Sequence, residues 1–446
     1  MPHNELNKAD YCHHKVSIQR IVKDDLCTGC GTCVGICPKN ALRIVRDTRG
    51  VYLPSVDGTR CDQCGICVQV CPGYSVDFDS LNKFIFGKIP NNVLGNYINC
   101  YLGYATDYEM RWNSSSGGLV TALLVFALQE NLIDGALITR MRIKNPLEPE
   151  VVIARSVEDI VSGSGSKYCP VPLNVAVRAL RKGEKYAVVG LPCHIHGIRK
   201  AEIVDIHLRE KIALHFGIFC SHTVSFHGTE FLLKRIGILE EDIAQISYRG
   251  KGWPGGMCVK MKNGNEIFVS SQEYWGNLLG SFFFTPIRCF SCYDALNDLA
   301  DISFGDAWLP EIMKKDKIGT SIVMIRTKKA NRLLKKAILR KKIVLTEIQS
   351  DDVIRSQAGT LNYKKKGLKA RFKVMRMFNK PLPAYNDHCL EKLRPDVRAY
   401  TTLISYANIY ITSNSHFSKL LKHTPSLILK LYAKLIAYLH SLTFSV

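Results

Sequence analysis

Two stretches near the amino terminus, CTGCGTCVGICP and CDQCGICVQVCP, carry the same run of cysteines, C-x2-C-x2-C-x3-C-P. Two intervening residues let consecutive sulfurs face one centre, which suits the thiolate ligands of a [4Fe-4S] cube. In two-cluster ferredoxins the last cysteine of each run binds the other cluster. We therefore expect two neighbouring cubes, held by Cys27, Cys30, Cys33 and Cys71 and by Cys61, Cys64, Cys67 and Cys37.

Zinc binding or chance spacing is the alternative interpretation of these runs, and two complete copies favour the iron clusters. Cubes with interleaved ligands must lie close together, which suits the relay of electrons. They do no substrate chemistry of their own, so another part of the chain must supply or remove the electrons.

Four further cysteines lie far from these runs. Cys193 and Cys220 each follow an apolar stretch typical of a strand, and the pair Cys289 and Cys292 lies in IRCFSCYDALNDLADISFGD. Four thiols are enough for one metal centre. From spacing alone, a zinc site and a further iron-sulfur cluster are both open.

Two loops rich in serine and glycine are candidate sites for an anionic cofactor. Residues 114–118 precede an apolar helix, whose first backbone N–H groups attract phosphate, and residues 162–168 follow later in the chain. Ordinary turns are the alternative, and neither loop is a complete G-x-G-x-x-G of a Rossmann site. The candidate residues are Ser115, Ser116, Gly117, Gly118, Thr121, Ser166, Lys167 and Tyr168.

The elements that must position these residues alternate between helices and strands after a joint near residues 86–92. Helical patterns are LVTALLVFALQEN, LNVAVRALRKG, FHGTEFLLKRIGI and ANRLLKKAILRKK. Strand patterns are GALITR, YAVVGLP, IALHFGIFC and TSIVMIRT, and MCVKMKNGNEIFV predicts a hairpin that turns at Asn263 and Gly264. This alternation indicates a mixed α/β domain.

Six blocks carry a resemblance to a known family: NSSSGGLVTALL, GSKYCPVP, VVGLPCHIHGIRKA, FGIFCSH, YRGKGWPGGM and CFSCYDALNDLADISFGDAW. In this order, over roughly residues 88–345, the chain resembles the coenzyme F420 hydrogenase/dehydrogenase beta-subunit family. The resemblance implies FAD at the two serine and glycine loops. It also implies a third [4Fe-4S] cluster, bound by Cys193, Cys220, Cys289 and Cys292.

The expected fold class is α+β in three parts. A bacterial-type two-cluster ferredoxin domain at residues 18–80 precedes a mixed α/β domain at 88–345 that binds the flavin and the third cluster. A basic, mainly helical extension follows at 346–446. Some members of the family lack the ferredoxin-like part and receive electrons through a separate subunit.

Composition and charge are those of a globular protein with a basic end. The 446 residues are 46% hydrophobic and 22% charged, and the net charge is +21. Residues 311–446 hold 28 Lys and Arg against 8 Asp and Glu. No module that reads nucleic acid accompanies these basic runs, so we expect no nucleic-acid partner.

The first twenty residues are polar and the chain has 17 cysteines. We therefore expect a cytoplasmic protein with reduced thiols, without a secretory signal. The last segment, SLILKLYAKLIAYLHSLTFSV, predicts an amphipathic helix. The basic extension could dock here on a partner subunit or on the inner face of the membrane, or the helix could pack on the protein's own core.

The leading functional hypothesis is an oxidoreductase in which FAD exchanges a hydride with coenzyme F420. Electrons then pass singly through the [4Fe-4S] clusters to ferredoxin or a partner subunit. The alternatives are a ferredoxin-dependent flavin reductase of another organic substrate and a pure electron-transfer subunit. We assign no catalytic residue, although His194, His196, Asp306 and Trp308 lie in the blocks of the resemblance.

Overall fold

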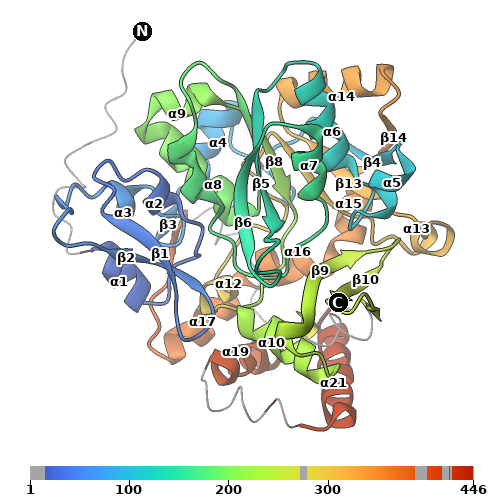
Figure 1. Ribbon diagram of the computed structural model, residues 1–446. Coiled ribbons are helices and arrows are strands. Elements are labelled where there is room, and N and C mark those ends of the chain that lie inside the picture. The colour runs from blue at the N-terminus through green and yellow to red at the C-terminus, as the bar shows by residue number, and fades with distance from the viewer. Residues whose placement is uncertain (1–15, 272–278, 387–398, 414–420, 422–423, 445–446) are drawn as a thin grey trace.

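The computed structural model describes residues 16–271, 279–386, 399–413, 421 and 424–444 (Figure 1). Cys12 and Cys389 lie outside the described residues. All twelve cysteines expected to bind clusters lie within them.

A small ferredoxin-like module forms the first part of the chain (blue in Figure 1). In each cysteine run, a glycine with positive φ precedes a one-turn helix, Gly31 at 83° and Gly65 at 77°, a backbone conformation that side chains disfavour. The two runs flank an antiparallel hairpin. The elements of the module are α1 (Ile18–Lys23), α2 (Thr32–Gly35), β1 (Leu42–Arg46), β2 (Tyr52–Val56), α3 (Ile66–Gln69) and β3 (Ser75–Val76).

An eight-stranded mixed sheet forms the centre of the molecule, in the order β14-β4-β13-β12-β8-β7-β5-β6. The middle strands β12, β8, β7 and β5 run parallel to one another, and the pairs outside them are antiparallel. The strands are β4 (Asn99–Ala105), β5 (Gly135–Met141), β6 (Pro149–Ala154), β7 (Tyr186–Gly190), β8 (Ile212–Ile218), β12 (Ile302–Asp306), β13 (Ser321–Ile325) and β14 (Ile343–Ile348).

Helices cover both faces of this sheet. On one face, α6 (Leu119–Gln129) and α14 (Lys328–Leu339) bury their apolar side chains against the strands. On the other face lie α4 (Phe78–Phe86), η2 (Leu173–Ala179), α8 (Pro192–Val204) and α9 (Ile206–Lys211). The short helices α5 (Tyr108–Trp112) and α7 (Val157–Ser162) complete this part. The core is therefore continuous on both sides of the sheet, with buried parallel strands in its middle.

A second, three-stranded sheet packs below the central one in Figure 1, together with α10 (Phe226–Arg235). Its strands follow the order β11-β10-β9. They are β9 (Ile243–Gly250), β10 (Gly256–Met261) and β11 (Glu266–Ser270), and η3 (Glu240–Asp242) precedes them. Two short helices, α12 (Ile287–Phe290) and α13 (Pro310–Lys315), flank β12 along the chain.

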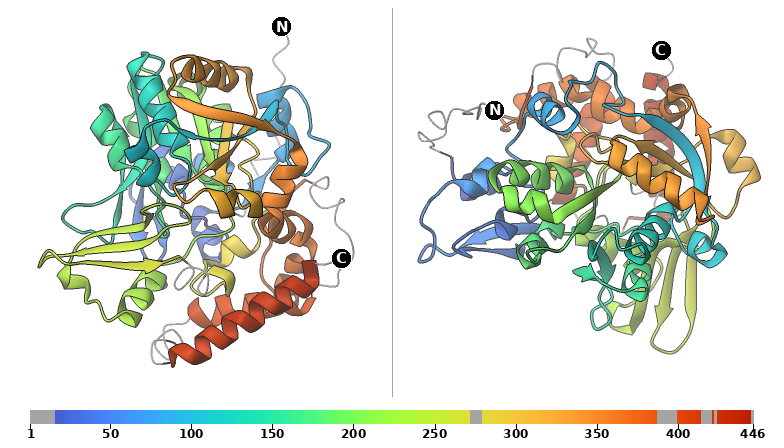
Figure 2. Two further views of the ribbon diagram at one scale, coloured as in Figure 1. Left: turned by 90° about the vertical axis from the view of Figure 1, so that its right-hand side faces the viewer. Right: turned by 90° about the horizontal axis from the view of Figure 1, so that it is seen from above.

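The last part of the chain is mainly helical and returns to the ferredoxin-like module. Strand β15 (Ala384–Tyr385) pairs in parallel with β3 of that module, and α21 forms an outer edge of the molecule (Figure 2). No helix among the described residues is long and apolar enough to cross a bilayer. The elements are α15 (Ser350–Ser356), α16 (Ala358–Leu361), the π-helix η4 (Asn362–Lys366), α17 (Leu368–Met377), α19 (Ala399–Ser413) and α21 (Ser426–Phe444).

The mixed α/β architecture and the ferredoxin-like module agree with the sequence prediction, including the hairpin at Asn263 and Gly264. One predicted helix differs: residues 173–179 of LNVAVRALRKG form a 3-10 helix. Its start is tied to the ferredoxin-like module, because the Asn174 amide donates to the Cys30 carbonyl at 2.9 Å. Tertiary contact has overridden a helical pattern here.

We expect Gly35→Ala to loosen the contact between the ferredoxin-like module and η2. A β-carbon at Gly35 would lie 2.1 Å from the Asn174 carbonyl oxygen, so the backbones must separate. Overpacking of this kind costs about 1–3 kcal/mol. The melting temperature of anaerobically prepared protein should fall, and in the matched control Gly58→Ala, where no atom lies within 4 Å of the new carbon, it should not. Equal melting temperatures for the two variants would contradict the expectation.

Candidate functional site

The cysteines of the two amino-terminal runs form two groups. Cys27 and Cys33 both interact electrostatically with Cys30 and Cys71. Cys67 interacts with Cys61, Cys64 and Cys37. Each group thus combines three thiols of one run with the last thiol of the other, as interleaved cluster ligation requires.

The four later cysteines also meet. Cys193 is the second residue of α8, just after β7, and Cys220 follows β8. Cys289 lies in α12, and Cys292 follows it. Cys193 interacts with the other three, and all four line one cavity. Burial raises the pKa of the Cys220 thiol to about 12. A bound metal would reverse this shift, because metal ligation deprotonates thiols.

This third cysteine group borders the first. Cys30 is a close electrostatic neighbour of Cys193, and Cys27 lines the same cavity as the third group. Arg288, buried beside Cys289, donates to the Gly73 carbonyl at 3.0 Å and to the Pro72 carbonyl at 3.1 Å. A cation is therefore fixed at the junction between the two groups.

Among the described residues, no three His, Cys, Asp or Glu side chains are placed to hold a single metal ion. A cube binds its thiolates through four different iron atoms, so this finding concerns sites for one ion, such as zinc, and not cluster sites.

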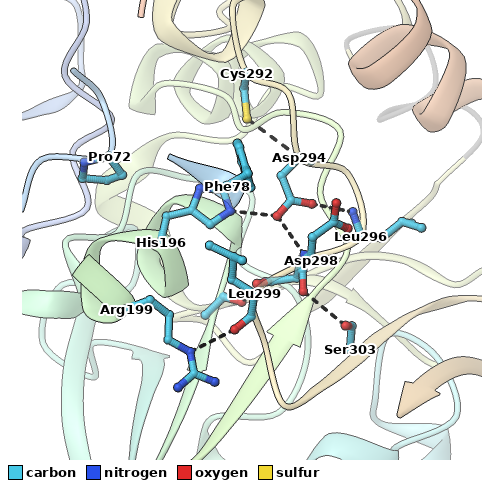
Figure 3. Close-up of polar contacts among 12 residues, drawn as sticks. Pro72, Phe78, His196, Arg199, Cys292, Asp294, Leu296, Asp298, Leu299 and Ser303 are labelled. Atoms are coloured by element: carbon cyan, nitrogen blue, oxygen red, sulfur yellow. Dashed lines mark hydrogen bonds and ion pairs between the residues drawn. The ribbon is translucent and has the colours of Figure 1, made fainter. Parts of the chain in front are cut away.

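The loop that carries Cys292 is held by a buried carboxylate, Asp294 (Figure 3). Asp294 Oδ1 accepts a hydrogen bond from the Leu296 amide at 3.0 Å. Its Oδ2 accepts from the Asp298 amide at 2.8 Å and lies 2.8 Å from His196 Nε2. Burial opposes the charge, but the contact with His196 and the nearby Lys365 hold the pKa of Asp294 below its usual range. The polar residues after Cys292 thus have a structural role, and His196 orients this loop.

A cavity of about 940 Å³ opens beside the third cysteine group. Six residues line both this large cavity and the cysteine cavity: Cys169, Val171, Leu191, His194, Cys220 and Thr223. The two spaces are thus separated by a wall one side chain thick. Cys220, a member of the third group, belongs to that wall.

His194 is a fixed part of this wall. Its Nδ1 accepts from the Leu191 amide at 3.1 Å, which leaves the proton on Nε2 for the Val171 carbonyl at 2.9 Å. Burial lowers the pKa of His194 to about 4, so the ring is neutral at pH 7. The two hydrogen bonds fix the orientation of the His194 ring in the wall.

The two serine and glycine loops meet at the cavity. The Ser166 amide donates to Ser115 Oγ at 2.7 Å, which joins the loops. Thr121, Ser166, Lys167 and Tyr168 line the cavity.

The rest of the first loop faces the sheet. Ser116 Oγ donates to the Thr320 carbonyl at 2.9 Å, and the Gly117 amide donates to Ser321 Oγ at 2.9 Å. Gly118 caps the amino terminus of α6 with φ 74°. None of these three residues is among those that line the cavity, so their contribution is to hold the loop against β13.

Lys167 also differs from the simple expectation of a phosphate-binding charge. Its ammonium donates to the carbonyls of Gly163, Ser164 and Gly165 at 2.5, 2.9 and 2.9 Å, and so closes its own loop. Burial lowers the pKa of Lys167 to about 8.

The cavity contains a charged and aromatic cluster to which sequence reasoning assigned no role. Arg249 forms two hydrogen bonds to Asp306, at 2.7 and 2.6 Å, and Trp253 Nε1 donates to the same carboxylate at 2.7 Å. The rings of Trp253 and Trp308 stack at 5.3 Å. The signal was present in the blocks YRGKGWPGGM and FGDAW, but only the fold brings these two blocks together.

The carboxy-terminal extension contributes to the same cavity. Gln357, Thr360 and Tyr363 line it, as do Ala433 and Lys434 of α21. These residues lie beyond the blocks that carry the family resemblance, so nothing in the sequence placed them here.

Comparison with known proteins supports this reading of the chain. Residues 100–178 and 183–351 match the amino-terminal and carboxy-terminal models of the coenzyme F420 hydrogenase/dehydrogenase beta subunit, and residues 26–75 match a 4Fe-4S dicluster domain. The beta subunit of coenzyme F420 hydrogenase from Methanosarcina barkeri is 30% identical over 266 residues, which cover 56% of this chain and 82% of that protein. The chain belongs to this family.

A longer relative of this chain is the coenzyme F420-dependent sulfite reductase of Methanocaldococcus jannaschii. It is 26% identical over 347 residues, which cover 74% of this chain and 49% of the relative. Among solved structures, a chain of the F420-reducing [NiFe] hydrogenase complex of Methanosarcina barkeri matches with a TM-score of 0.51 at 25% identity, covering 66% of this chain and 98% of that one. These relatives are oxidoreductases or their subunits, and this chain is an oxidoreductase that also carries a 4Fe-4S dicluster domain.

We expect Asp306→Asn to destabilise the protein by about 2 kcal/mol or more, because removing one partner of a buried ion pair leaves the other charge uncompensated. The side chains of Arg249 and Asp306 are 6% and 18% exposed. The control is Glu266→Gln, which breaks the more exposed pair with Lys251 and should cost about 1 kcal/mol or less. The comparison of melting temperatures under anaerobic conditions tests this, and an equal loss in the two variants would count against it.

Proposed function

We propose that this oxidoreductase exchanges a hydride between coenzyme F420 and bound FAD and passes electrons through three [4Fe-4S] clusters to ferredoxin or another redox subunit. The observation that carries the proposal is the shared wall. Cys220 belongs both to the third cysteine group and to the lining of the large cavity. A group bound in the cavity would therefore lie within one side chain of a cluster ligand.

The residues present fit three clusters. Each group offers four thiols, the number that a cube needs. Backbone amides also reach the sulfurs, as Gly29 does at Cys27 and Ala41 at Cys37, both at 3.4 Å. Buried cations lie nearby: Arg288 beside the third group, and Lys200, which donates to the Cys71 carbonyl at 2.9 Å. Positive charge of this kind offsets the negative charge of ligated thiolates.

The large cavity fits a flavin cofactor in size and chemistry. Its volume of about 940 Å³ is that of a site for a large organic ligand. Tyr168, Trp308 and Tyr363 offer aromatic surfaces, while Thr121 and Ser166 offer hydrogen-bonding groups. When bound, FAD would supply the conversion between two-electron hydride transfer and single electrons. The chain's own residues bind and orient it and, through α21, cover part of the cavity.

We infer the order of the clusters from which groups lie close together. The third group borders the cavity, Cys193 borders Cys30 of the first group, and Cys33 of the first group borders Cys67 of the second. At the far end, Cys64 is the one exposed thiol of the twelve. We infer a single line from the cavity through the third and first clusters to the second, which meets the redox partner near Cys64.

The last helix supports a docking role for the extension. Leu427, Leu431 and Leu435, spaced four residues apart on α21, are 68%, 58% and 51% exposed. An apolar stripe of this kind suits a partner subunit or a membrane surface. The solved relative is itself a chain of a hydrogenase complex, which favours a subunit as the partner.

The first test counts cofactors. Anaerobically purified protein should contain about twelve irons, four per cube, and one FAD per chain. Cys220→Ser should reduce the count to about eight irons, because one cube loses a ligand. Cys258→Ser, at a buried cysteine outside the three groups, should leave it at about twelve. Eight irons in the unaltered protein, or zinc in place of the last four, would refute the three-cluster proposal.

The second test measures electron flow. The full chain, mixed under nitrogen with reduced F420 and a one-electron acceptor such as ferredoxin, should oxidise the F420, as followed by its visible absorbance. In Cys220→Ser, reduction of the bound flavin by reduced F420 should persist, while reduction of ferredoxin falls at least about tenfold, because the first link of the line is removed. If the unaltered protein oxidises no reduced F420 with any acceptor, the hydride donor is a different one.

A further inference from the structure

Lys364 is a buried cation inside the third cysteine group. Lys364 is 1% exposed and lines the same cavity as the four thiols. It interacts electrostatically with Cys292, Cys220 and Cys289. A buried ammonium requires compensating negative charge. The ligands of a cluster would supply that charge, since they bind as thiolates.

A π-helix places this lysine. In η4, two consecutive residues of the run KKK turn inward: Lys364 towards the cysteines and Lys365 towards Asp298 and the Val93 carbonyl, while Lys366 is exposed. One-turn π-helices are rare and often mark functional sites. Lys365 has a carboxylate partner of its own, whereas the charge of Lys364 is directed at thiols.

The same segment holds the backbone of the cysteine pair. Arg371 of α17 donates from Nε to the Phe290 carbonyl at 2.5 Å, and from Nη2 to the Cys292 carbonyl at 3.0 Å and the Lys364 carbonyl at 2.9 Å. The Tyr385 hydroxyl donates to the Ser291 carbonyl at 3.1 Å and accepts from Arg288 at 2.9 Å. Two side chains of the extension thus fix three consecutive peptide groups around the third site.

Lys364, Arg371 and Tyr385 lie outside the regions that match the family models, since those matches end at residue 351. The extension segment 362–385 therefore adds a buried ammonium and two side chains that bind backbone carbonyls to the third site, all from outside the matched region. At the second group, burial and the neighbouring Asp62 carboxylate raise the pKa of the exposed Cys64 thiol.

We propose that the extension segment 362–385 forms part of the third cluster's site, and that the Lys364 ammonium raises the reduction potential of this cluster. A fixed positive charge stabilises the reduced form, which is more negative by one electron, and local charge is one of the determinants of cluster potential. Lys364 is thus a positioning and tuning residue that makes the third cluster a better acceptor for electrons from the cavity. This inference rests on the proposed third cluster.

The test is a redox titration of the anaerobic full chain, followed by electron paramagnetic resonance, with Lys364→Met, Lys364→Arg and Lys366→Met. In Lys364→Met the equilibrium constant for reducing the third cluster should fall at least tenfold, about 59 mV for one electron. Lys364→Arg keeps the charge and should stay near the unaltered potential. Lys366→Met removes an exposed lysine from the same π-helix and should leave the reduction potential of the third cluster unchanged.

The outcomes separate this inference from the three-cluster proposal. If the unaltered protein holds only eight irons, the third cluster is refuted. If Lys364→Met binds twelve irons and titrates like the unaltered protein, Lys364 does not tune the cluster and the inference is overturned. If Lys364→Met loses the third cluster, Lys364→Arg decides: retention shows that the charge is required and supports the inference, and loss shows a steric role and overturns it.

Discussion

The close contact between the first and third cysteine groups is the constraint on which the rest of the structure depends. The Asn174 amide binds the Cys30 carbonyl, and a β-carbon at Gly35 or Gly197 would collide with Asn174 or Thr32. Glycine at these two positions lets the ferredoxin-like module approach α8, whose second residue is Cys193. Arg288 seals the junction from the other side through the carbonyls of Pro72 and Gly73. Without this approach the first and third cysteine groups would lie apart.

Buried charge organises the site around that contact. Thiols inside a protein resist ionisation, as the raised pKa of Cys220 shows, yet iron ligation needs thiolates. Arg288, Lys200 and Lys364 offer the compensating charge, and each is fixed through backbone carbonyls or the thiols themselves. This arrangement agrees with the rule that a buried charge is tolerated where an opposite charge or hydrogen bonds compensate it.

The extension shows why charge counts along a chain say little about location. Its basic runs suggested a docking surface in solvent. In the structure two lysines of the run KKK are buried, one against Asp298 and one against the third cysteine group. α21 keeps the surface that the sequence suggested, with its exposed leucine stripe, and it also lines the large cavity through Ala433 and Lys434. The extension therefore belongs to the site as well as to the surface.

The sequence alone determined the features that depend on local spacing. Two residues between cysteines, and a glycine before each short helix, set the geometry of a cluster loop within one turn of backbone. Periodicity likewise placed α6, α10, α14 and the strands β5, β7, β8 and β13. Composition marked the two serine and glycine loops, which the Ser115 to Ser166 hydrogen bond joins. The family resemblance added the expectation of FAD at these loops.

Only the tertiary structure decided which distant residues share a wall or a charge. It put Cys220 and His194 between two cavities, paired Arg249 with Asp306, and brought Lys364 of the extension to the third site. Such contacts depend on how whole elements pack. The position of a side chain along the sequence does not show which distant surface it will contact, because packing joins segments hundreds of residues apart.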